Sequence, residues 1–138
     1  MVSKLLVALL LLALCVTIHA AGLITAAQWV RHHALPAIEN FRHATLLLIG
    51  IAAWCLLLHL VQILAWALFY EWHDTFPDIA SSVYFSAVTY TTTGYGDLVL
   101  PREWRIVGGV EALTGILMCG FSTGLFYAVF SKSFNATD

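Results

Sequence analysis

Three long apolar segments dominate the chain and limit what it can fold into. Residues 5–30 and 44–70 contain no charged side chain, and residues 106–131 contain only Glu111. A helix of about 20 apolar residues spans the hydrocarbon core of a bilayer. The sequence therefore predicts an all-α membrane protein with three transmembrane helices.

Composition supports this class and argues against others. Hydrophobic residues make up 61% of the chain and charged residues 10%, whereas soluble domains average about 45–50% and about 25%. Such a chain is too apolar for a soluble enzyme, a nucleic-acid binder or a disordered segment. We expect it to lie in a lipid bilayer, without enzymatic activity and without a resident cofactor.

A fourth uncharged stretch, residues 79–96, differs from the other three because it is rich in serine, threonine and tyrosine. Pro77 and Asp78 are typical residues for the start of a helix. A helix over residues 79–91 would be about 20 Å long and would end inside the membrane. Its C-terminus carries about half a negative charge, which favours a nearby cation. The sequence therefore predicts a re-entrant pore helix shielded by protein.

The five residues that follow the predicted pore helix suit a backbone that binds cations. They are Thr92, Thr93, Gly94, Tyr95 and Gly96. A dehydrated K⁺ needs several oxygen ligands in a row, but an ordinary extended chain points its carbonyls to alternate sides. Glycine accepts positive φ, so Gly94 and Gly96 allow the carbonyls to turn to one side. Tyr95 is expected to point away from these carbonyls and to brace the strand from behind.

Residues 92–96, followed by Asp97, resemble the selectivity filter of potassium channels, in which the corresponding residues are Thr-Val-Gly-Tyr-Gly. Thr93 replaces the valine. Residues 44–131 as a whole resemble the two-helix pore module of this family. That module has an outer helix (here 44–70), a pore helix (79–91), a filter (92–96) and an inner helix (105–131).

The resemblance implies a potassium-selective channel that conducts passively as a homotetramer. K⁺ would be the permeant ion, bound through Thr92, Thr93, Gly94 and Tyr95. Two alternatives stay open, namely a non-selective cation channel and a non-conducting membrane subunit that keeps the pore fold.

Charges between the segments predict the orientation of the chain. Residues 31–43 hold two arginines and three histidines against one glutamate, which places this loop in the cytoplasm by the positive-inside rule. The N-terminus would then lie outside, and the tail 132–138 inside, in the plasma or inner membrane. In the alternative, the segment 1–30 begins with a signal peptide cleaved after Ala20, which would invert the orientation.

Two acidic residues near the filter are candidates for function. Asp97 is expected to ring the outer mouth, where we expect the Tyr84 hydroxyl to hydrogen-bond it and stiffen the filter. Glu111 is expected to pack behind the pore helix, bonded to Ser86 or Thr89, since intramembrane carboxylates are costly and tend to be functional. An acidic ring facing the cavity is the alternative for Glu111.

Other polar or small residues within the apolar segments receive simpler interpretations. Gly115, one turn beyond Glu111, is expected to act as a gating hinge of the inner helix. His19 and His59 are expected to be hydrogen-bonded packing residues. Three histidines in the predicted cytoplasmic loop lie where they could respond to pH, namely His32, His33 and His43.

Overall fold

The computed structural model of the protein describes residues 2–34 and 41–135. Helix α1 (Val2–Trp29) continues into a π-helical turn, η1 (Val30–Ala34). Helix α2 (Phe41–Trp72) and the short helix α3 (Ile79–Tyr90) follow, and a 3-10 turn, η3 (Arg102–Trp104), leads into α4 (Arg105–Asn135). None of the described residues lies in a β-strand, so the predicted all-α class is confirmed.

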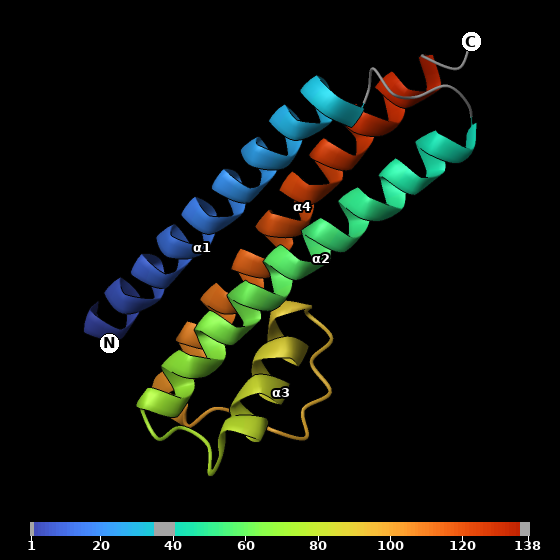
Figure 1. Ribbon diagram of the computed structural model, residues 1–138. Helices are drawn as coiled ribbons and strands as arrows, with labels where there is room; N and C mark the ends of the chain where they lie inside the picture. The colour runs from blue at the N-terminus through green and yellow to red at the C-terminus, as the bar shows by residue number, and fades with distance from the viewer. Residues whose placement is uncertain (1, 35–40, 136–138) are drawn as a thin grey trace.

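The three long helices lie side by side, and α3 packs at one end of them against α2 and α4 (Figure 1). Helix α1 begins at the end that holds α3, and helix α4 ends at the opposite end (Figure 1). At the α3 end, the Lys4 ammonium lies 3.8 Å from the ring centroid of Trp104, the last residue of η3 before α4. This contact fixes the start of α1 beside the entry to α4.

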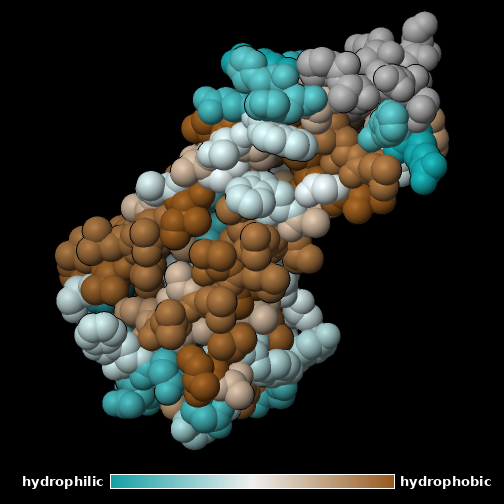
Figure 2. All heavy atoms as spheres, in the orientation of Figure 1, coloured by the Kyte–Doolittle hydropathy of each residue, from teal (hydrophilic) through white to brown (hydrophobic). Residues whose placement is uncertain are grey.

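All three long helices are long and apolar enough to cross a membrane. At most 28% of the most apolar window of any of them is buried within the chain. Figure 2 shows hydrophobic residues across the middle of the molecule and hydrophilic residues gathered towards both ends. The chain is therefore a multi-pass membrane protein whose apolar faces are available to lipid or to other subunits.

The helices are longer than the apolar segments that predicted them. The outer helix, expected over 44–70, runs over 41–72, and the inner helix, expected over 105–131, runs to 135. The expected loop 31–43 is correspondingly shorter, because residues 30–34 continue the first helix. Charge marks the edge of the membrane but does not end a helix, since charged residues at an exposed helix end are well solvated.

Two parts of the expected organisation lie outside the described residues, namely 35–40 in the loop and 136–138 in the tail. The pore helix, expected over residues 79–91, ends one residue earlier, at Tyr90.

Aromatic packing holds α3 against α2. Tyr70 and Trp66 of α2 are fully buried, and Tyr70 meets Phe85 of α3 edge to face, with ring centroids 5.3 Å apart. The Ser86 hydroxyl of α3 also lies 2.8 Å from the backbone carbonyl oxygen of Ile63 in α2. These contacts position the C-terminus of α3, and with it the segment that follows.

Candidate functional site: the loop after α3

A side-chain cap starts α3 at the predicted residue. The Asp78 carboxylate accepts a hydrogen bond of 2.7 Å from the backbone N–H of Ser81. This bond lowers the pKa of Asp78 below its ordinary value. The helix has 12 residues, so it is about 18 Å long and too short to cross a bilayer.

A Schellman motif ends α3 and begins the candidate filter. The N–H of Thr92 donates to the carbonyl of Thr89, and the N–H of Thr93 donates to the carbonyl of Val88, both at 2.9 Å. This pair of bonds requires a left-handed residue between them, and Thr92 occupies that position with φ of 59°. Threonine there is unusual, because the left-handed region costs a non-glycine residue roughly 1–2 kcal/mol.

Positive φ recurs at every second residue of the candidate filter, namely at Thr92 (59°), Gly94 (58°) and Gly96 (78°). Alternation of left-handed and right-handed residues turns successive N–H groups to one side of the chain. The positive φ expected at Gly94 and Gly96 is confirmed. No pattern in the sequence predicted that Thr92 would share their conformation.

Two backbone amides of the candidate filter donate to the same carbonyl oxygen. The N–H groups of Thr93 and Gly94 both donate to the carbonyl of Val88, at 2.9 and 3.3 Å. In a planar trans peptide the carbonyl points opposite to the N–H, and none of the described peptide bonds is cis. The carbonyls of Thr92 and Thr93 therefore both point away from α3, to the same side of the chain.

The filter side chains are exposed in the single chain. The hydroxyl of Thr93 lies 2.9 Å from that of Thr91, within hydrogen-bonding distance. The side chain of Tyr95 is 71% exposed, so it does not brace the strand within its own subunit. Any bracing by Tyr95 needs a neighbouring chain.

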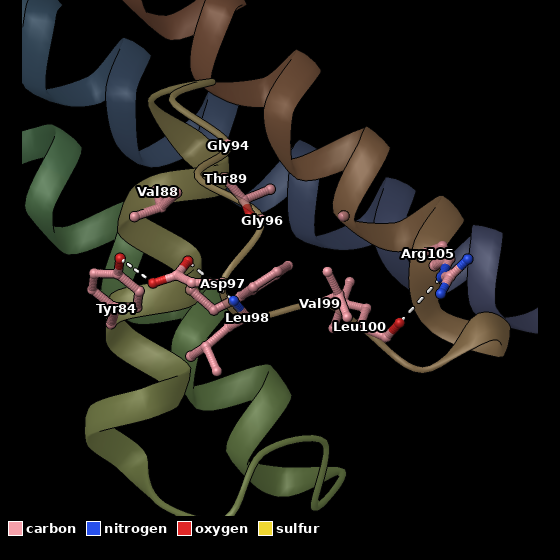
Figure 3. Close-up of a pocket in the computed structure, with 12 residues that line it drawn as sticks. Tyr84, Val88, Thr89, Gly94, Gly96, Asp97, Leu98, Val99, Leu100 and Arg105 are labelled. Carbon is pink, nitrogen blue, oxygen red and sulfur yellow. Dashed lines mark hydrogen bonds between the residues drawn. The ribbon is translucent and has the colours of Figure 1, made fainter.

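The hydrogen bond expected at the outer end of the loop is present. The Tyr84 hydroxyl donates to Asp97 Oδ2 at 2.6 Å, and the backbone N–H of Leu98 donates to Oδ1 at 3.0 Å (Figure 3). The bond from Tyr84 lowers the pKa of Asp97 and raises that of Tyr84. Both residues line an open hollow of about 430 Å³ between α3, the filter and the start of α4 (Figure 3).

Glu111 lies behind α3 and is fully buried within the chain. The Tyr70 hydroxyl donates to one oxygen of its carboxyl group at 2.7 Å, and the Ser86 hydroxyl lies within hydrogen-bonding distance of the other oxygen. Of the two partners expected from the sequence, Ser86 is confirmed, and no bond to Thr89 is present. The alternative of an acidic ring that faces the cavity is wrong, because Glu111 has no exposed surface.

Gly115 lies where α4 crosses the end of α3. An added Cβ there would come within 1.8 Å of the carbonyl oxygen of Tyr90. Close approach of two backbones therefore requires glycine at this position. The hinge role stays a prediction.

The family of the chain follows from comparison with known proteins. A family model described as ion channel matches residues 46–132, which is well over half of the chain. The protein therefore belongs to this family of two-transmembrane-helix ion channels. No curated protein and no solved structure matches the chain.

Proposed function

We propose that the protein is a potassium-selective channel in which residues 92–96 form the selectivity filter. The observation that carries the proposal is the backbone of this segment. Positive φ alternates along it, and the carbonyls of Thr92 and Thr93 point to one side. Rows of backbone carbonyls that replace the hydration shell of the ion are the basis of selectivity in potassium channels. The C-terminus of α3 lies directly before this segment and adds the partial negative charge of the helix dipole, which favours a cation there.

We propose further that four copies surround the pore. One chain supplies one row of carbonyls, and a single row cannot enclose an ion. Cyclic symmetry gives every copy the same environment, and four rows match the resemblance of the filter to that of potassium channels. In such an assembly, a neighbouring chain would cover two features that are open in the single chain. They are the exposed ring of Tyr95 and the open hollow beside Asp97.

The proposed orientation places the filter mouth and the N-terminus outside and the C-terminus in the cytoplasm. Arg31 and Lys132 lie at the opposite end of the helices from α3, on the side expected to be cytoplasmic. A retained α1 is favoured over a signal peptide. Cleavage after Ala20 would remove His19, which is fully buried and hydrogen-bonded to α2 and α4.

Reversal potentials in opposed K⁺ and Na⁺ gradients test the proposal in planar bilayers that contain the purified protein. The wild type should reverse near the K⁺ equilibrium potential. Gly94→Ala should lose selectivity or conduction, because Gly94 has φ of 58°. Gly50→Ala is the matched control, since no heavy atom lies within 4 Å of a Cβ added there.

Three other results would contradict parts of the proposal. A reversal potential near zero would indicate a non-selective cation channel. Absence of current from well-folded protein would indicate a non-conducting subunit. A native mass different from four chains would exclude the tetramer.

A further inference from the structure

Five polar side chains from all four helices form a closed ring of hydrogen bonds inside the bundle. The members, in order around the ring, are His19 (α1), Gln62 (α2), Tyr90 (α3), His59 (α2) and Ser122 (α4). Distances between consecutive donors and acceptors run from 2.7 to 3.1 Å. His19, Gln62 and Tyr90 are at most 2% exposed. We call these five side chains the polar ring.

The protons of the polar ring follow from counting donors. Tyr90 gives its one proton to the Gln62 carbonyl oxygen, so Nδ1–H of His59 must donate to the Tyr90 oxygen. Nε2 of His59 is then bare and accepts from Ser122. The Ser122 oxygen in turn accepts from Nε2–H of His19.

The side-chain amide of Gln62 supplies the last donor of the polar ring. Its N–H donates to the bare Nδ1 of His19 at 2.7 Å. With the amide in this orientation, every member donates once and accepts once, and both imidazoles are neutral. A second proton on His19 would place two donors face to face. A second proton on His59 would remove the acceptor that Ser122 uses.

The polar ring joins α1 to the base of the filter. Tyr90 is the last residue of α3, directly before the Schellman turn that orients the carbonyls of residues 92 and 93. His19 is buried in the contact of α1 with the pore helices. Although α1 lies outside the pore module, it therefore supplies one of the side chains that hold Tyr90 in place.

Within the polar ring, the two histidines are the groups that can take up a proton in acid. The titratable groups that face it are Cys15 from α1, Cys55 from α2, and Cys119 and Glu111 from α4, and α3 contributes Tyr90 itself. Thiols are neutral in acid. Glu111 is a carboxyl group that can bind a proton, but its hydrogen bonds go to Tyr70 and Ser86 and not to the polar ring. A hollow of about 210 Å³ reaches Ser122.

We propose that the polar ring is a proton-sensitive clamp on the filter, an inference that rests on the proposed channel function. With both imidazoles neutral, the closed ring holds Tyr90 and the filter base in the conducting position. Protonation of His19 or His59 opens the ring and lowers conduction. His19 is thus a positioning residue that acts through Gln62 and Tyr90.

Potassium flux into proteoliposomes, measured with equal pH on both sides, tests this inference. Wild-type flux should fall about tenfold as the pH is lowered from 8 to 4. The bonds of the ring use both imidazoles in the neutral form, so they oppose protonation in the range near pH 6.5 where a free histidine changes charge. Tyr90→Phe keeps the aromatic ring but removes the hydroxyl, and Ser122→Ala removes one hydroxyl from a different helix. Both variants should show low flux at pH 8 and little further change in acid.

His32→Phe is the matched control, because His32 is an exposed histidine outside the polar ring. It should keep the flux and the pH profile of the wild type. Ser122→Ala decides the outcome if Tyr90→Phe does not fold. A wild-type pH profile in the folded ring variants would assign acid inhibition to another group, such as Asp97, and would overturn the inference.

A wild-type flux that does not change with pH would also overturn it. Both of these results leave the proposed channel intact. Absence of wild-type flux at every pH would instead overturn the proposed function, and the inference with it.

Discussion

A Cβ atom on Gly115 would lie 1.8 Å from the carbonyl oxygen of Tyr90 and 2.8 Å from its carbonyl carbon. No real Cβ approaches backbone so closely, and backbone cannot move aside as the end of a flexible side chain can. The inner helix therefore touches the last residue of the pore helix through a glycine. Movement of α4 at this point would act directly on the base of the filter.

Gly115→Ala should destabilise the assembled channel and abolish conduction. Overpacking in a well-packed interior costs about 1–3 kcal/mol, and contact with backbone places this variant at the upper end. Thermal unfolding and K⁺ flux measure the two effects. Gly109→Ala and Gly120→Ala are controls in the same helix, since an added Cβ meets no atom within 4 Å in the chain at either position. Equal stability in all three variants would contradict the close contact.

Local patterns in the sequence were sufficient to predict the helices and the positive φ of two glycines in the candidate filter. Apolar length predicted the three spans, Asp78 predicted the start of α3, and two glycines predicted where φ is positive. Each of these features depends on a few neighbouring residues. The left-handed Thr92 was missed because the end of α3, and not the side chain of Thr92, imposes its conformation.

The partners of buried polar groups were harder to predict. His59 and Gln62, three residues apart on a helix, indicate a polar face, but not that this face meets His19 and Ser122. Glu111 was expected to bond Ser86 or Thr89, and Ser86 is the partner present. Its second partner, Tyr70, is an aromatic residue at the end of an apolar segment. That position is typical of a residue that lies at the membrane–water interface. Contacts between segments far apart in sequence depend on helix rotation, which a weak polar pattern does not define.

Glu111→Gln should be tolerated far better than Glu111→Ala. Ser86 has one hydroxyl proton and two acceptors in reach, the carbonyl of Ile63 and the carboxylate of Glu111. A protonated Glu111 would donate to Ser86 and free that proton for Ile63, while Tyr70 still donates to the second oxygen. Glutamine reproduces this pattern with its amide N–H.

Alanine at position 111 leaves a cavity, and each buried polar group without a partner costs about 1–3 kcal/mol. Thermal unfolding of the two variants in the same detergent compares them. If Glu111→Gln unfolds at as low a temperature as Glu111→Ala, the site requires a carboxylate anion, and the assignment of a proton to Glu111 is wrong.

Thr93→Val should keep K⁺ selectivity. The filter ligands proposed here are backbone carbonyls, and valine has nearly the same shape as threonine. The change removes the hydroxyl contact with Thr91, which is exposed in the single chain and is not needed to turn the carbonyls. Reversal potentials in mixed K⁺ and Na⁺ give the answer, with Gly94→Ala as the variant expected to fail. Loss of K⁺ current in Thr93→Val would show that the Thr93 hydroxyl is itself required.

Tyr84→Phe should make the outer mouth more sensitive to external acid. In the folded chain the hydrogen bond from Tyr84 lowers the pKa of Asp97. A lowered pKa means that the stabilisation is fully present above the ordinary aspartate value of about 3.9 and is lost as the pH falls through the lowered value. Without the hydroxyl, the pKa of Asp97 rises towards the ordinary value, so protonation begins at higher external pH.

Single-channel conductance against external pH measures this shift. In the proposed tetramer, four carboxylates at the mouth would concentrate cations, and protonation would remove their charge. The curve of Tyr84→Phe should be displaced to higher pH than that of the wild type. Asp97→Asn should remove the dependence in both backgrounds, which identifies Asp97 as the titrating group. An unchanged midpoint in Tyr84→Phe, with normal filter inactivation, would show that this hydrogen bond neither tunes Asp97 nor stiffens the filter.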